Sequence, residues 1–214
     1  TTTTTTMTTM TPTCNMVHIV PVKDLKQLVL YWEFPSQYPI YRNKVNFYLN
    51  YLLEHQGTGS LYQLLKGKGL INSISSGVYM ESSSFSLYRV AIDLTNDGLE
   101  HIDTILRHFY QYVHLIKQET ILKDSARLGH EIFDEVRKLH EQSFVWLEKV
   151  SPSTYTSRIS KRMQEYPIED CLYAPYHFGQ FDPNLILEHL ELLSPSRMHI
   201  QVVSKMFEEE AQLQ

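Results

Sequence analysis

The chain has 214 residues, of which 43% are hydrophobic and 20% are charged, and its formal net charge is -5. This composition is typical of a globular protein, and the length suffices for one domain with a real core or for two small ones. The Lys and Arg residues are scattered, so the basic stripe of a nucleic-acid-binding protein is missing. No apolar run reaches the ~20 residues that span a bilayer. We therefore expect neither a nucleic-acid partner nor a membrane partner.

Both ends of the chain differ in composition from its middle. Residues 1–16 are rich in threonine, show no periodicity, and are interpreted as a low-complexity leader or linker remnant. We expect a folded domain over residues 17–207 and a polar tail or linker over residues 208–214. Cys14 and Cys171 lack metal-type spacing, which favours a reducing compartment. The N-terminus lacks a signal-peptide core, so a cytoplasmic location is expected, or an organelle if a targeting sequence lies upstream.

Hydrophobic periodicity predicts an alternation of strands and helices along the chain. The predicted strands are residues 25–34, 70–79, 85–94 and 199–203. The predicted helices are residues 40–53, a short one capped by Ser60, a long one from the Thr95 cap to about 116, another from about 120 to 147, and two shorter ones near 153–164 and 184–193. Successive strands in the middle of the chain favour an antiparallel sheet. We therefore predict an α+β fold with several helices on one face of a mostly antiparallel sheet.

The end of the first predicted helix has the spacing of a metal site. Inverted zinc peptidases carry His-x-x-Glu-His, in which both histidines bind the metal and the glutamate acts as general base. Here Glu54 and His55 hold the last two positions, but Tyr51 holds the first. A phenol has an ordinary pKa of about 10 and is a poor zinc ligand at neutral pH. The stretch therefore has the pattern of a catalytic helix without its chemistry.

The sequence around this stretch resembles the non-catalytic second domain of insulinase-family zinc metallopeptidases, the family of insulin-degrading enzymes and pitrilysins. Residues 55–61 and 64–69 carry the resemblance most clearly. It continues in order through residues 20–25, 90–99, 155–159, 166–170, 181–183 and 202–207. The resemblance implies an insulinase-like αβ sandwich.

The resemblance also implies that a third metal ligand would be a glutamate on a later helix. Glu131 and Glu135 lie near the family's separation from His55. They either complete a degenerate site with His55 and Tyr51 or line the solvated face of an amphipathic helix, and we favour the second interpretation. Two good ligands leave zinc short of the three protein ligands that catalytic sites use. We expect no metal and no catalytic residue in this chain, with zinc in the catalytic domain of the parent protein.

What the resemblance implies for this domain is substrate binding. In the family, such a domain walls an enclosed chamber and anchors the N-terminal segment of a peptide along a strand edge by β-augmentation. The matching strand positions here are Ile74, Ser75, Ser76, Gly77 and Val78, beside Glu54, His55 and Gln56.

Three positions depart from the family pattern, in which Glu54 and Ser76 are glycines and Gln56 is a glutamate. Gln56 lacks the charge to hold a substrate's terminal amine, and Glu54 is expected on another helical face. An ordinary sheet strand with small residues is the alternative interpretation of residues 74–78.

The sequence thus predicts a non-catalytic, substrate-binding and chamber-forming domain of a zinc metalloendopeptidase that degrades peptides. Its expected partners are a peptide substrate and either other domains of the same polypeptide or a homologous active subunit. The alternative is a stand-alone inactive peptidase homologue that serves as a scaffold or regulatory subunit. An active enzyme in its own right is disfavoured because the first ligand is missing.

Overall fold

The computed structural model describes residues 16–122 and 126–208. The predicted Thr-rich leader, apart from Met16, and the predicted tail, apart from Glu208, lie outside these residues. Within them no helix is long and apolar enough to cross a membrane.

A five-stranded sheet forms one layer of the molecule, and its strand order is β1-β5-β2-β4-β3. Its strands are β1 Met16–Ile19, β2 Gln27–Pro35, β3 Ile71–Glu81, β4 Phe85–Leu94 and β5 His199–Val203. Only the β1–β5 pair is parallel, and the other pairs are antiparallel. The sequence predicted β2 to β5 but not β1, which has four residues, three of them exposed, and therefore no alternating pattern.

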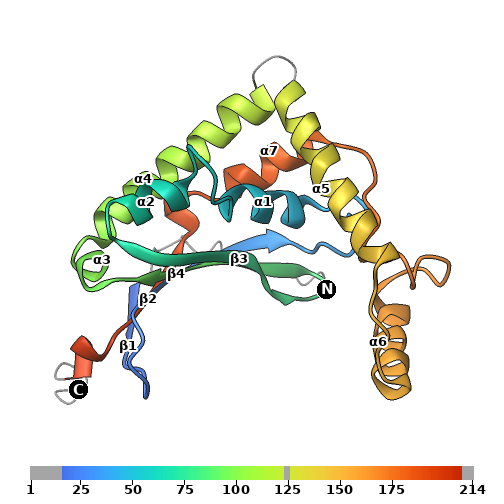
Figure 1. Cartoon of the computed structure of the whole chain (residues 1–214), viewed down its shortest axis with the longest axis horizontal. Coiled ribbons are helices and arrows are strands. Elements are labelled where there is room, and N and C mark those ends of the chain that lie inside the picture. Colours follow the sequence, from blue (N-terminus) through green and yellow to red (C-terminus); the bar gives the residue numbers. More distant parts are fainter. Residues whose placement is uncertain (1–15, 123–125, 209–214) are drawn as a thin grey trace, which may run out of the picture.

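The helices α1, α2, α4, α5 and α7 lie above one face of this sheet (Figure 1). The bounds of the helices are α1 Val45–Leu53, α2 Leu61–Gly67, α3 Asn96–Glu100, α4 Ile102–Ile116, α5 Arg127–Val145, α6 Pro152–Glu165 and α7 Pro183–Leu192. Short 3-10 turns flank β5 at Pro195–Arg197 and Lys205–Phe207. The predicted α+β class, with a mostly antiparallel sheet and helices on one face, is confirmed.

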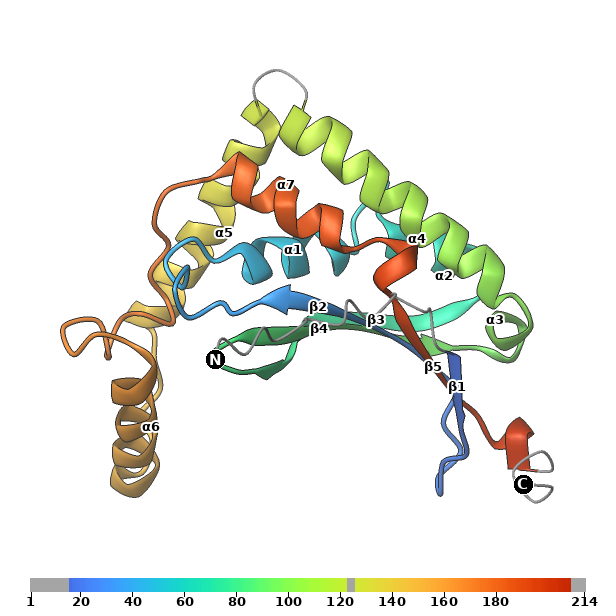
Figure 2. The same cartoon turned by 180° about the vertical axis from the view of Figure 1, so that it is seen from behind.

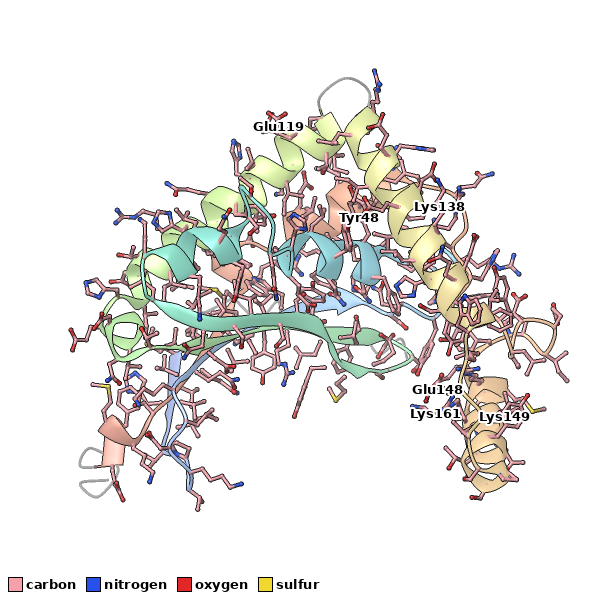
Figure 3. The ribbon with its side chains drawn as sticks, viewed as in Figure 1. Tyr48, Glu119, Lys138, Glu148, Lys149 and Lys161 are labelled. Carbon is pink, nitrogen blue, oxygen red and sulfur yellow. The ribbon has the colours of Figure 1, made fainter. Side chains whose placement is uncertain are left out.

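Aromatic rings fill the space between the sheet and the helices. Trp32 of β2 stacks on Phe109 of α4 with ring centroids 5.6 Å apart, and both side chains are completely buried. Tyr48 lies between α1 and α5 (Figure 3), where its ring centroid is 6.2 Å from that of Phe133. Burial of these side chains fixes α4 against the sheet and α1 against α5.

Two predicted long helices differ from the observed ones. The first is interrupted at His101, which separates α3 from α4 with a non-helical ψ of 33°. The second was expected to begin at Thr120, but Lys117–Leu122 continue α4 as a π-helical segment. The Thr120 hydroxyl donates to the carbonyl of Ile116 at 2.7 Å, and hydroxyls that bond back in this way disturb regular helical bonding. The periodicity of apolar residues does not reveal where an α-helix widens into a π-helix.

The helix α6 projects away from the sheet and its covering helices (Figure 2). None of its residues is buried. Lys161 lies on α6, where its Nζ is 3.6 Å from Oε1 of Glu165, and Glu148 and Lys149 lie where the chain passes from α5 into α6 (Figure 3). The compact part of the described chain is therefore the sheet with the helices above it.

Candidate functional site

The candidate site begins where α1 ends. Leu53 is the last helical residue, and the N–H of Glu54 donates to the carbonyl of Asn50 at 2.9 Å. His55 therefore lies beyond the helix, and its ring centroid is 6.2 Å from that of Tyr51. A Cβ on Gly57 would lie 2.5 Å from the Nε2 atom of His55, so the glycine makes room for this ring. Exposed His55 and Gln56 belong to a loop, not to a continuous catalytic helix.

Tyr51 contacts one of the two predicted carboxylates. Its hydroxyl donates to Oε1 of Glu135 at 3.0 Å, whereas Glu131 pairs with Arg127 at 3.1 Å. Partial burial, followed by the Glu135 hydrogen bond, raises the pKa of the Tyr51 phenol above its ordinary value. The phenol is thus held neutral as a hydrogen-bond donor. In residues 16–122 and 126–208, no group of three or more His, Cys, Asp or Glu side chains could hold a metal ion.

Glu54 reaches β3 instead of pointing away from it. Its Oε1 atom accepts from the backbone N–H of Ser76 at 2.5 Å and from the Ser76 hydroxyl at 3.1 Å. The expectation that this side chain lies on another helical face than that of Gln56 assumed helical geometry for both residues. The expectation was wrong because α1 has already ended, and the helix-cap residue directs its side chain towards the neighbouring strand.

Asn50 supports the same contact from one turn earlier in α1. Its Oδ1 atom accepts from the Tyr88 hydroxyl at 2.7 Å and lies 3.4 Å from the hydroxyl of Ser76. Tyr88 is completely buried, and desolvation raises the pKa of its phenol. The sequence alone indicated neither Asn50 nor Tyr88 as part of the site. The signal for Asn50 was a polar residue four positions before Glu54, next to the apolar stripe of the helix.

β3 is the edge strand that the peptide-anchor hypothesis requires. It pairs with β4 on one side and is last in the strand order, so in the described part of the chain no strand covers its other side. Ile74 is buried, Ser75 is exposed, and Ser76, Gly77 and Val78 are partly exposed. Within the described residues, the five positions therefore belong to a strand edge below α1 that no other strand covers.

Gly77 has a backbone conformation that favours glycine. Its φ is 156°, and a Cβ there would lie 3.6 Å from Nδ2 of Asn50. The pairing with β4 then shifts by one residue between Val78 and Met80. A cavity of about 440 Å³ opens at this irregular end of the strand, and its walls include Val78, Phe47 and Tyr166.

Comparisons with known proteins identify the family. A family profile described as "Peptidase M16 inactive domain" matches residues 8–125, more than half of the chain. The chain belongs to the peptidase M16 family. A second M16 profile, described as "Middle or third domain of peptidase_M16", matches residues 144–214. The resemblance drawn from the sequence, to the insulinase and pitrilysin family, is confirmed.

Curated relatives agree with this assignment to the M16 family, and a solved structure shares the fold. The chain is 33% identical to the insulin-degrading enzyme of Drosophila melanogaster over 92% of its own length and 19% of that protein. It is 33% identical to the human insulin-degrading enzyme over 89% of its length and 18% of that protein. The crystal structure of pitrilysin matches 89% of the chain with a TM-score of 0.81 at 20% identity, covering 20% of the pitrilysin chain. The chain thus spans less than a fifth of the length of these insulin-degrading enzymes.

Proposed function

We propose that this M16 chain is a non-catalytic, substrate-binding and chamber-forming domain of a zinc metalloendopeptidase that degrades peptides. The observation that carries the proposal is the strand edge at residues 74–78, which in the described part of the chain has no strand neighbour on its outer side. An extended peptide adds to such an edge through main-chain hydrogen bonds, with little demand on its sequence. The insulin-degrading enzymes among its relatives act, by their names, on a peptide hormone.

The chain's own residues support binding better than catalysis. Tyr51, bonded to Glu135, holds the position of a metal ligand, and His55 lies outside α1. The zinc of the parent enzyme would therefore be held by another domain. The domain limits of residues 17–207 belong to this proposal. So do the expected partners, which are the peptide and the other domains of the same polypeptide.

A binding assay with backbone-modified peptides tests the proposal without changing the protein. The labelled oxidised B chain of insulin is titrated with the M16 protein, and fluorescence anisotropy reports binding. Unlabelled extended peptides then compete, one with normal backbone and one N-methylated at alternate residues. Strand addition predicts that N-methylation abolishes competition whereas scrambling the sequence does not. Equal competition by the N-methylated peptide would rule out strand addition, and absence of B-chain binding would count against substrate binding.

A stand-alone inactive homologue is the second candidate, favoured by the loss of the first ligand position to Tyr51. The two candidates differ in the size of the native protein. An immunoblot of source cells against this chain detects a band several times larger than 25.1 kDa if it is a domain of a long protease. A band near that mass would instead support a scaffold or regulatory subunit.

A further inference from the structure

The side chain of Glu54 occupies the strand edge at which a peptide would add. In an antiparallel ladder, each residue directs its N–H and C=O to the same side of the strand. The N–H of Ser76 donates to Oε1 of Glu54, which comes from α1, so this N–H points away from β4. It is therefore one of the donors that an added strand would need. In this structure a carboxylate already accepts from it.

The carboxylate is held at the edge by more than one contact. The Ser76 hydroxyl also donates to Oε1 of Glu54 at 3.1 Å. Asn50, four residues earlier, lies 3.4 Å from the same hydroxyl and is itself fixed by the buried Tyr88 through a 2.7 Å hydrogen bond. Hydrogen bonds to an ionised acceptor are the stronger class, so the contact competes effectively with water and with a neutral peptide carbonyl.

Nothing in the helix requires a glutamate at this position. The backbone of Glu54 is in the ordinary right-handed region, and its N–H already donates to Asn50. Any residue could end α1 in this conformation. The Ser76 contact is thus a property of the Glu54 side chain alone, and a shorter side chain would leave the N–H of Ser76 free.

We propose that Glu54 is a displaceable latch on the peptide-binding edge, closing β3 at Ser76 until an extended peptide replaces its carboxylate. This inference rests on the proposed function, because it concerns the same strand. A peptide that adds to β3 offers a carbonyl to the Ser76 N–H, and the released carboxylate turns into solvent. Binding is weakened by the free energy of the contact that is lost. The residue at position 54 therefore sets the affinity of the edge by occupying, or leaving free, the N–H of Ser76.

The first arm of the test measures peptide affinity. Binding of the labelled oxidised insulin B chain is compared for the wild type, Glu54→Ala and Glu54→Gln. Glu141→Ala is the matched control, because it removes an exposed carboxylate on α5 far from β3 in the chain. The latch predicts about tenfold tighter binding for Glu54→Ala, a smaller gain for Glu54→Gln, whose amide oxygen still accepts, and no change for Glu141→Ala. If the wild type binds and Glu54→Ala binds equally or more weakly, the latch is refuted.

The second arm reads the contact itself and needs no peptide. Amide hydrogen exchange of Ser76, followed by NMR, is expected to be at least about tenfold faster in Glu54→Ala than in the wild type, because the acceptor is lost. Equal exchange rates would refute the latch. If no variant binds the B chain while Ser76 exchange responds as expected, the proposed peptide binding fails but the carboxylate contact stands. Thermal melts of each variant verify that it is folded.

Discussion

At the scale of single residues, Tyr51 holds the position at which a zinc-peptidase helix carries its first histidine ligand. The phenol oxygen lies 3.0 Å from Oε1 of Glu135, and the rings of Tyr51 and His55 are 6.2 Å apart. An imidazole is shorter than a phenol, so a metal bound to it would lie near the present phenol oxygen. Tyr51→His is therefore expected to create a three-ligand set with His55 and Glu135. Atomic emission after dialysis should find zinc in Tyr51→His and none in the wild type.

The double variant Tyr51→His with Glu135→Gln is the control for that experiment. It keeps both imidazoles but removes the carboxylate, so zinc should be lost again. Tyr51→His with Glu131→Gln should retain the metal, because Glu131 pairs with Arg127 instead. Zinc in the wild-type chain, or none in Tyr51→His, would contradict the ligand geometry described here.

Lys44 is a second residue whose chemistry differs from that of its surface counterparts. It precedes α1, is 6% exposed, and donates through Nζ to the carbonyl of Ala174 at 2.7 Å. Desolvation lowers the pKa of its ammonium to about 8, from an ordinary value of 10.5. Between these two values the unfolded chain binds more protons than the folded one, so stability rises with pH. The shift corresponds to about 3 kcal/mol as an upper bound.

The variant Lys44→Met isolates this effect. Its free energy of unfolding should exceed that of the wild type at pH 7, and the difference should shrink as the pH rises from 8 towards 10. The ionisation of the tyrosines changes the free energy of unfolding of both proteins equally, so its effect cancels in the difference between them. Urea unfolding of both proteins at a series of pH values measures this difference. A difference that does not change with pH would show that Lys44 is not desolvated in the folded chain.

At the scale of helices and strands, two glycines provide a matched test of the packing. A Cβ on Gly98, in α3, would lie 1.9 Å from the backbone oxygen of Leu70, so the turn could not pack against the start of β3. Gly98→Ala should destabilise the chain by about 2–4 kcal/mol. Gly67, at the end of α2, has nothing within 4 Å of such a Cβ. Gly67→Ala should stabilise by about 0.5–1 kcal/mol. Urea unfolding measures both changes in the free energy of unfolding. Changes of opposite sign would confirm the close packing at Gly98, and equal changes would contradict it.

The sequence predicted those elements whose burial is periodic. β2 and β4 alternate over most of their length, with one run of three buried residues in each, and both have strand neighbours on both sides. β1 escaped prediction because its pairing with β5 leaves its side chains exposed. The break at His101 escaped because apolar residues continue at helical spacing through it. Local periodicity reports which face is buried, but it does not report where a helix is locally widened or broken.

The candidate site was predicted to a similar extent. The sequence identified the strand at residues 74–78 and its neighbourhood with Glu54, and the structure brings them together. Sequence spacing did not reveal that Glu54 bonds to Ser76, because this contact depends on the residue at which α1 ends. Nor did it reveal that Glu135, and not Glu131, contacts Tyr51, because both lie on the same helix and only its rotation relative to α1 distinguishes them.

At the scale of the whole molecule, large apolar side chains are exposed where α5 ends and after α6. Val145 and Trp146 at the end of α5 are 73% and 81% exposed, and Ile168 after α6 is 76% exposed. Clusters of exposed large apolar residues mark surfaces that bind another protein surface. These residues lie in the region that matches the M16 middle or third domain. We expect another part of a longer parent polypeptide to cover them.

Tryptophan fluorescence tests this expectation, because the chain has two tryptophans, and Trp32 is completely buried whereas Trp146 is not. In this chain alone, iodide should quench the Trp146 emission and leave that of Trp32, so that Trp146→Phe removes the quenchable fraction. In a longer polypeptide that contains this chain and covers the surface, Trp146 should be shielded and its emission shifted to the blue, because an apolar partner replaces water around the indole. The surface is an interdomain one only if both changes occur. Equal quenching of Trp146 in the isolated chain and in the longer polypeptide would mean that α5 ends at a solvent-exposed surface in both.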